Sequence, residues 1–257
     1  MTDSPPAFPE ARPAATLVVM RDRARGAPEI LMVERAGVMA FAPGAMVFPG
    51  GRVDPGDHDL ARALGVPDIE EGAARIAAIR ETIEEAALPI GFARTPDAAA
   101  IATIRAALDD GASFGEALGA VGATLDLDAL VPFARWRPDY SPVRRYDTRF
   151  YLAALPPDAP APRVDGTENV RLCWATAKRV LDDADAGRLS LIFPTRRNLE
   201  RLALFPSHAA AVAQARAFPV RVVVPWSETR DGEEYLCIPD DLGYPVTAER
   251  RDLVRRG

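Results

Sequence analysis

The stretch from residue 68 to residue 88 constrains the fold more than any other part of this sequence. It reads DIEEGAARIAAIRETIEEAAL, with alanines and isoleucines at helical spacing and strong helix formers between them. Asp68 is a suitable cap, with Glu71 three residues further on as in a capping box. The sequence therefore predicts one long helix here.

The second half of this helix carries charge on one face. Glu81, Glu84 and Glu85 are neighbours because residues three or four apart share a helix face, and Arg80 lies four residues before Glu84. Clustered carboxylates raise one another's pKa unless a cation neutralises them. Mg²⁺ takes oxygen ligands, commonly a few carboxylates together with water and substrate phosphate. The face therefore indicates a divalent cation site; the alternative is a solvated acidic helix face with one i, i+4 ion pair.

The rest of the chain alternates between strands and helices. Strands are expected at 15–22 and 29–36, as a hairpin, and again at 144–156 and 169–176. Further helices are expected at 95–110, 113–125, 175–189, 194–205 and 207–218, with closing strands at 220–226 and 233–239. Because the order is not a strict βαβ repeat, it favours an α/β fold with a mixed sheet flanked by helices.

Composition limits the partners and the compartment. The net charge of −6 gives no global attraction to nucleic acid or acidic membranes, so no nucleic-acid or membrane partner is expected. No apolar run approaches membrane-spanning length, and the first residues lack the pattern of a signal peptide. Cys173 and Cys237 do not form a disulfide framework and are interpreted as core thiols in a reducing compartment. A cytoplasmic location is expected.

A glycine-rich turn precedes the helix, in the stretch FPGGRVDPGD at 48–57. Gly50 and Gly51 would let the backbone approach a phosphate or donate a carbonyl to a metal, although an ordinary turn has the same composition. Together, turn and helix resemble the Nudix box, G-x5-E-x7-R-E-U-x-E-E-x-G-U, where U is aliphatic. The matching residues are Gly51, Asp57 in place of Glu, Arg80, Glu81, Glu84, Glu85 and Leu88.

Three departures from the box stand out. Thr82 replaces an aliphatic residue, Ala87 replaces the glycine after the glutamates, and 22 residues separate Asp57 from Arg80 where the box has seven. Such an interrupted box resembles one branch of the Nudix superfamily, the peroxisomal coenzyme A diphosphatases and their bacterial relatives. The similarity extends over about residues 15–205, through the segments MAFAPGAMVFPGG, RRYDTRFYLAALP, TENVRLCWAT and FPTRRNLERLALF.

The resemblance implies an α/β/α sandwich with a mixed sheet and extra helices. Residues 1–14 would form a loose arm, and 15–257 a single domain with insertions around 58–70 and 96–130 and a helical C-terminal extension. It also implies that Glu81, Glu84 and Glu85 bind Mg²⁺ or Mn²⁺, with the Gly50 carbonyl as a further ligand. Arg80 would orient these carboxylates, and Gly51 would lie against the substrate.

Other candidates come from outside the box. The general base varies in the superfamily, and Glu168 is a further acidic candidate, although an exposed loop glutamate fits it nearly as well. Phosphate could be bound by Arg35, Arg144 and Arg145, although any one of them is more often a surface charge. Asp147 is expected to pair with an arginine. Trp136 and Tyr140 are expected in the core or at its rim rather than stacked on a base, and neither His58 nor His208 is assigned a role.

The resemblance implies hydrolysis of a nucleoside diphosphate linked to another moiety. Coenzyme A or acyl-CoA is the expected substrate, giving 3′,5′-ADP and 4′-phosphopantetheine, although the signature that usually precedes the box in coenzyme A hydrolases is poorly matched. The alternatives are another nucleotide pyrophosphatase, acting on ADP-ribose, NADH or dinucleoside polyphosphates, and a non-catalytic nucleotide-binding module. Homodimers, frequent in the superfamily, are the assembly expected by analogy.

Overall fold

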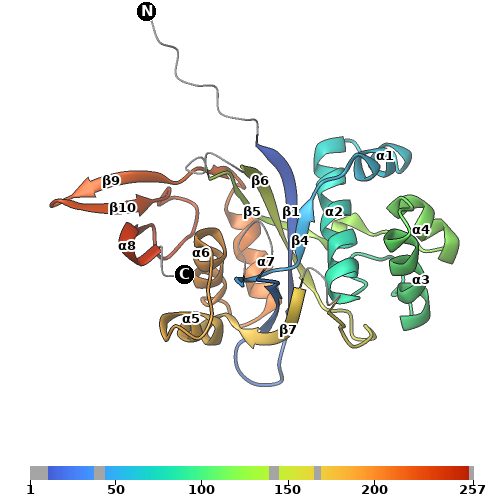
Figure 1. Ribbon diagram of the computed structural model, residues 1–257, viewed down its shortest axis with the longest axis horizontal. Helices are drawn as coiled ribbons and strands as arrows, with labels where there is room; N and C mark the ends of the chain where they lie inside the picture. Colours follow the sequence, from blue (N-terminus) through green and yellow to red (C-terminus); the bar gives the residue numbers. More distant parts are fainter. Residues whose placement is uncertain (1–10, 38–43, 139–144, 165–168, 255–257) are drawn as a thin grey trace, which may run out of the picture.

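The computed structural model describes residues 11–37, 44–138, 145–164 and 169–254 of the chain. In these parts an eight-stranded mixed sheet lies between two layers of helices, and a three-stranded sheet lies near the C-terminus (Figure 1). The expected α/β/α sandwich is therefore confirmed. The strands of the large sheet are β1 (Arg12–Arg21), β2 (Glu29–Arg35), β3 (Met46–Val47), β4 (Gly50–Arg52), β5 (Val131–Trp136), β6 (Tyr146–Ala154), β7 (Asn169–Thr176) and β8 (Val222–Val223).

Strand β1 is the centre of the large sheet. It pairs antiparallel with β2, through Met20–Ile30 and Arg21–Glu29, which confirms the expected hairpin. It also pairs antiparallel with β4 and parallel with β6. β1 begins at Arg12, so residues 12–14 belong to the sheet rather than to the expected arm.

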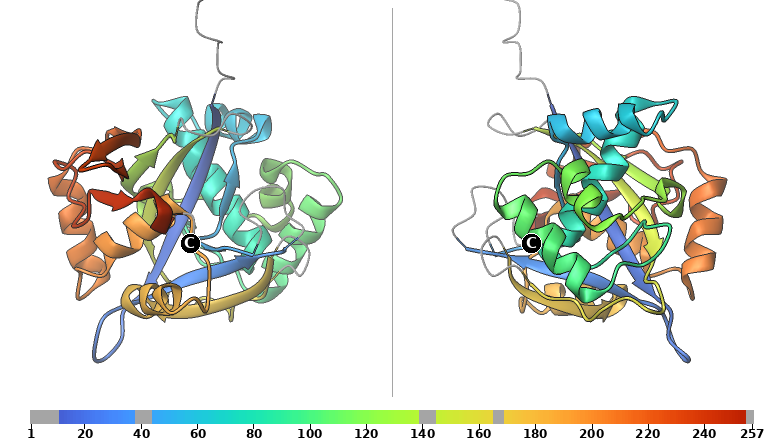
Figure 2. Two further views of the ribbon diagram at one scale, coloured as in Figure 1. Left: turned by 60° about the vertical axis from the view of Figure 1, so that its left-hand side comes forward. Right: turned by 90° about the vertical axis from the view of Figure 1, so that its right-hand side faces the viewer.

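Helices cover both faces of this sheet (Figures 1 and 2). Alternate residues of β1 enter two hydrophobic clusters: Leu17 and Val19 pack towards α2, while Val18 and Met20 pack on the side of α6. The middle of β1 and most of β2 are buried on both faces, which explains why these strands are apolar runs without alternation. One layer contains α1 (Pro55–Ala63), α2 (Ile69–Ala86), α3 (Ala98–Asp109) and α4 (Phe114–Val121), and the other contains α5 (Ala177–Asp185), α6 (Phe193–Leu202) and α7 (His208–Ala217).

The insertions and the C-terminal extension form defined structure. The first insertion contributes to α1 and the start of α2, and the second folds as α3, α4 and a 3₁₀ turn at Leu127–Ala129. The extension is only partly helical, because a small sheet follows α7 and its β9–β10 hairpin projects from the body (Figure 1). Its elements are β9 (Trp226–Arg230), β10 (Glu233–Cys237), β11 (Ala248–Arg250) and α8 (Arg251–Val254). Within the described ranges, no helix has the length and apolar character needed to cross a membrane.

Candidate active site

Helix α2 lies across the sheet and presents its charged face at β4. Asp68 caps it, because its side chain accepts a hydrogen bond from the Glu71 amide at 3.1 Å. Glu71 forms an ion pair with Arg75 at 3.1 Å and another with Arg149 of β6 at 3.3 Å. The predicted cap is therefore present, and the Glu71 carboxylate also links the first turn of α2 to the sheet.

The two glycines of the turn form a short strand that both β1 and α2 approach closely. Gly50 and Gly51 pair with Thr16 and Ala15 of β1. A Cβ added at Gly50 would overlap the Ala15 carbonyl oxygen, and a Cβ added at Gly51 would overlap the Glu81 carboxylate. Gly50 therefore requires glycine because the overlap is with backbone, whereas a side chain at Gly51 would displace the Glu81 carboxylate, which lies directly against β4.

Arg80 is the central cation of the site and is only 7% exposed. Its Nη1 donates to Glu81 Oε1 at 2.9 Å and to Glu84 Oε2 at 2.8 Å. Its Nη2 also donates to the Arg52 carbonyl at 2.9 Å. Burial lowers the pKa of Arg80, but the hydrogen bond to Asp57 and the surrounding carboxylate charges outweigh it and raise the pKa. Arg80 therefore stays charged and holds two of the three glutamates.

Asp57 is a partner of Arg80 to which the sequence interpretation gave no function. Its carboxylate is buried and accepts from Arg80 Nε at 3.1 Å and from Nη2 at 3.0 Å. It lies in the first turn of α1, where its Oδ2 also accepts from the Asp54 amide at 2.8 Å. Its match to the acidic position of the box was the signal for this contact.

Glu85 lies apart from Arg80 and is held by two strands. Its Oε2 accepts from the Gly50 amide at 2.9 Å, and its Oε1 accepts from Asn169 Nδ2 at 3.0 Å. Asn169 begins β7 and is fully buried. The sequence interpretation selected the adjacent Glu168, which lies outside the described residues, and missed Asn169. An amide side chain at the start of a predicted strand, directly after an acidic residue, was the available signal.

The site carries more negative than positive charge. Burial, and then the charges of Glu85 and Glu84, raise the pKa of Glu81 to about 8, although Arg80 acts in the opposite direction. Burial also raises the pKa of Glu84, whose side chain is 34% exposed. The site thus contains four carboxylates, Asp57, Glu81, Glu84 and Glu85, and one guanidinium, which contacts the first three. An added cation would relieve this excess.

The carboxylates fit a divalent cation in chemistry but are not already arranged around one. Among the described residues, no group of three His, Cys, Asp or Glu side chains is placed to hold a metal ion. Glu81 and Glu84 turn towards Arg80, whereas Glu85 turns towards Gly50 and Asn169. The oxygen donors and the uncompensated charge suit Mg²⁺ or Mn²⁺. Binding one therefore requires a carboxylate to turn away from Arg80.

The arginines expected to bind phosphate lie in different places. Arg35 pairs with Asn169 across β2 and β7, so the two side chains share the face on which Asn169 reaches Glu85. The Arg145 carbonyl accepts from the Arg12 amide at 2.9 Å, at the end of the sheet. Arg144 lies outside the described residues. Of the two described arginines, Arg35 lies opposite Asn169, whose side chain contacts Glu85.

The remaining candidates have structural contacts. Asp147 accepts two hydrogen bonds of 2.7 Å from Arg135, as expected for a structural pair. Trp136 is buried and donates to the Tyr244 hydroxyl at 2.9 Å, which confirms its place in the core. Tyr140 lies outside the described residues. His58 lies 3.2 Å from the Asp54 carbonyl oxygen.

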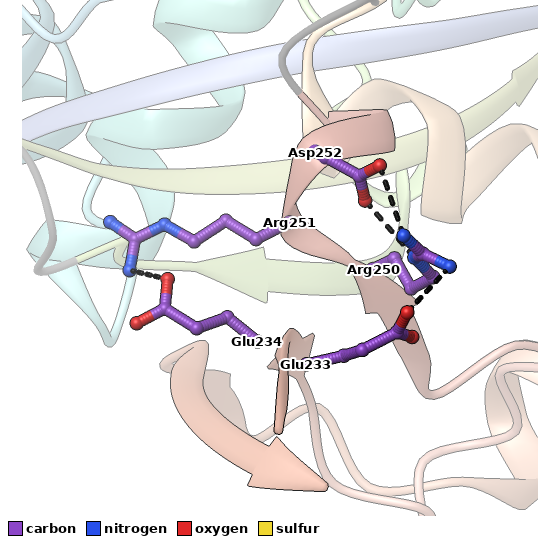
Figure 3. A pocket seen from close by; sticks show the side chains of 5 residues that line it. All are labelled: Glu233, Glu234, Arg250, Arg251 and Asp252. Carbon is purple, nitrogen blue, oxygen red and sulfur yellow. Dashed lines mark hydrogen bonds and ion pairs between the residues drawn. The ribbon is translucent and has the colours of Figure 1, made fainter. Parts of the chain in front are cut away.

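A separate hollow of about 300 Å³ lies on the C-terminal sheet, away from the glutamates. Its charges pair within the hollow: Arg250 lies 2.9 Å from Glu233 and 3.2 Å from Asp252, and Arg251 lies 3.5 Å from Glu234 (Figure 3). These five side chains, three acids and two arginines, all pair with one another, so the hollow offers no unpaired charge to a ligand. The glutamate face of α2 is the better candidate for an active site.

Comparison with known structures decides the family. A solved Nudix hydrolase from Alicyclobacillus acidocaldarius matches with a TM-score of 0.69 and 32% sequence identity. The match covers 80% of this chain and 97% of that one. This chain belongs to the Nudix hydrolase family. The resemblance inferred from the interrupted box is therefore confirmed.

Curated proteins give the same family. A Gallus gallus protein named acyl-coenzyme A diphosphatase NUDT19 is 27% identical over 237 residues, covering 70% of this chain and 62% of that protein. A Caenorhabditis elegans protein whose name places it among the nudix hydrolases is 29% identical over 194 residues, covering 74% of this chain and 60% of that protein. This Nudix chain thus spans less than two thirds of the length of both relatives. No protein-family model matches it.

Proposed function

We propose that this Nudix chain hydrolyses the diphosphate bond of a nucleotide-derived small molecule with the help of a divalent cation, Mg²⁺ or Mn²⁺. The observation that carries the proposal is the excess of carboxylates on α2 beside the glycine strand β4, with Arg80 bound to Glu81 and Glu84. An acidic helix face that served only solubility would not enclose a guanidinium that is 7% exposed. The membership in a hydrolase family supports the same conclusion.

The reaction consumes one water molecule. Its oxygen forms a bond to one phosphorus, the bond from that phosphorus to the bridging oxygen breaks, and the bridging oxygen leaves with the other phosphate. A bound divalent cation would polarise the attacked phosphoryl group and neutralise the leaving phosphate. Glu84, more exposed than Glu81, is the carboxylate that we assign to take a proton from the water. Arg80 would keep Glu81 and Glu84 oriented, and Gly51 would leave room for the substrate beside Glu81.

We propose coenzyme A or an acyl-CoA as the substrate, with 3′,5′-ADP and a 4′-phosphopantetheine as products. Support comes from the box interrupted between Asp57 and Arg80, and from the similarity to a protein named as an acyl-coenzyme A diphosphatase. Rates on CoA, acetyl-CoA, ADP-ribose, NADH and diadenosine polyphosphates with Mg²⁺ test this choice. Fast turnover of ADP-ribose beside slow turnover of CoA would replace the substrate and keep the reaction type.

The variant Glu84→Gln tests the reaction itself. We expect kcat to fall by about 10²–10³-fold, because several kcal/mol of transition-state stabilisation depend on this carboxylate. Glu70→Gln is the matched control, since Glu70 lies on the same helix with a 63% exposed side chain and a contact only to His58 among the described residues. Undiminished turnover by Glu84→Gln would assign the activity to another site or to a contaminant.

A further inference from the structure

Helix α2 has its C-cap at Ala87, in a backbone conformation that is unfavourable for alanine. Ala87 follows the helix with φ of 54° and ψ of 33°, in the left-handed region. Its amide still donates to the Ile83 carbonyl at 2.9 Å. Glycine adopts this conformation freely, whereas a Cβ adds steric cost. The chain thus keeps the helix ending of the box without the glycine that stabilises it.

Two contacts from outside the helix hold the same turn. The final carbonyls of a helix have no partners within it. Arg105 Nη2 donates to the Glu84 carbonyl at 3.0 Å, and the Arg163 amide donates to the Ala86 carbonyl at 2.8 Å. A guanidinium at this end also suits the helix dipole. The turn that bears Glu84 and Glu85 is therefore fixed by residues distant in the sequence.

Arg105 belongs to α3, which lies in the second insertion. Ile101 and Ile104 on the same helix are buried in the cluster that contains α2, so α3 is anchored independently of the arginine. The guanidinium binds the backbone of Glu84, so it acts on where the turn lies. Loss of this one contact should leave α3 in place and release the end of the glutamate helix.

We propose that Arg105 is a positioning residue that holds the last turn of α2, and with it Glu84 and Glu85, in place for cation binding. Its contribution offsets the unfavourable conformation of Ala87. The second insertion would then support the active site directly. This inference rests on the proposed function, because the cation is the ligand that the glutamates are proposed to bind.

Mn²⁺ binding, measured by electron paramagnetic resonance without substrate, tests the inference. We expect Arg105→Leu to weaken Mn²⁺ binding by about 10-fold, the scale seen when a residue that supports metal ligands is lost. Ala87→Gly added to Arg105→Leu should restore most of the affinity, because the turn no longer opposes its own conformation. The Mn²⁺ affinity of Arg105→Gln, which keeps a hydrogen-bond donor without the charge, should lie between those of Arg105→Leu and the wild type. This variant replaces Arg105→Leu in the test if the leucine variant does not fold.

The matched control is Arg75→Leu. Arg75 Nη1 donates to the Leu127 carbonyl at 2.9 Å, a similar contact on the first half of α2. The Arg75→Leu variant should have a lower Tm than the wild type and the same Mn²⁺ affinity. Amide hydrogen exchange at residues 83–88 should accelerate in Arg105→Leu and slow again with Ala87→Gly.

Two results would overturn the inference. Wild-type Mn²⁺ affinity in Arg105→Leu would do so and leave the proposed function intact. An equal loss in Arg75→Leu would also do so, because it would show general destabilisation. A wild-type protein that binds no Mn²⁺ and hydrolyses none of the nucleotides would instead overturn the proposed function and this inference with it.

Discussion

Two helices of this Nudix chain bury an arginine beside glutamates. The two groups differ in their numbers of acidic and basic side chains. On α2, Arg80 faces Glu81 and Glu84 from its own helix and Asp57 from α1, so acids exceed bases. On α6, Arg197 is 1% exposed and lies 2.7 Å from Glu200 and 2.9 Å from Glu249 of β11. There Arg196 supplies a second base, 3.4 Å from Glu200, and its further partner Asp185 is 59% exposed, so the charges balance among the less exposed side chains.

This difference distinguishes the candidate active site on α2 from the α6 group, which has a structural role. The balanced group on α6 attaches the C-terminal sheet, because Glu249 comes from β11 while its partners come from the helix. Burial raises the pKa of Glu200 to about 7 and lowers the pKa of Arg197, so both shift towards their neutral forms. Pairing therefore does not fully offset desolvation even where the charges balance. On α2, where they do not balance, a cation has more to contribute.

Removing the buried arginine from each helix should give the largest effects and the clearest difference between the two regions. Arg80→Met and Arg197→Met should each lower the free energy of unfolding by about 3–5 kcal/mol in EDTA, because each removes the nearest guanidinium from carboxylates that are largely buried. Mn²⁺ should reduce the difference in unfolding free energy between Arg80→Met and the wild type, because the cation can replace the missing charge. It should leave the corresponding difference for Arg197→Met unchanged, because Mn²⁺ stabilises that variant and the wild type alike. Urea unfolding with and without Mn²⁺ measures both, and equal rescue of the two variants would contradict the distinction.

The pH dependence of stability should sharpen the account of α6. The native pKa of Glu200, about 7, lies above its ordinary value of 4.5, so the native state binds this proton more tightly than the unfolded state. The resulting stabilisation is complete below pH 4.5 and is lost as the pH rises through 7. Relative to Glu200→Gln, the wild type should lose up to about 3 kcal/mol over this range, at about 1.4 kcal/mol per pKa unit.

Urea titrations of both proteins at several pH values in EDTA measure this difference. Subtracting one protein from the other removes the contribution of Glu81, whose pKa of about 8 lies in a neighbouring range. A constant difference across the range, or one of opposite sign, would show that folding does not raise the pKa of Glu200.

The smallest expected effect compares two backbone positions, one in each region. Among the described residues, the non-glycine positions with positive φ are Ala87, at 54°, and Asp231 in the β9–β10 turn, at 49°. Ala87→Gly should stabilise the protein by about 1 kcal/mol, whereas Asp231→Gly should gain little, because aspartate tolerates this region better than alanine. Thermal unfolding of the two variants tests the ranking, and a lower Tm for Ala87→Gly would refute it.

Local features of the fold could be predicted from the sequence. The predicted helix at 68–88 is α2 at Ile69–Ala86, with Asp68 as its cap, because helical periodicity and capping are read from neighbouring residues. The β1–β2 hairpin followed for the same reason. β9 was missed beyond Trp226, because SETR has no apolar residue and pairs with β10 through exposed positions.

The site was predictable only as far as the helix itself. The shared face of the three glutamates and the Arg80–Glu84 pair follow from helix geometry. The contact of Asn169 with Glu85 spans 84 positions and that of Arg105 with the Glu84 carbonyl spans 21, so both depend on how strands and insertions meet. That Glu81, Glu84 and Glu85 bind a cation stays a prediction, and the structure adds that Arg80 is bound to two of these carboxylates.

The parallel pairing of β1 with β6 also has a consequence for the newborn polypeptide. β1 ends at Arg21, whereas its partner is complete only at Ala154. On the ribosome, β1 therefore cannot pair with β6 until both segments expected as insertions have been translated. Such distant pairing makes folding slow. Until Ala154 emerges, the apolar run around Leu17 can pack only against elements translated earlier, among them β2, β4 and α2, and its exposure in this interval is what a chaperone would reduce.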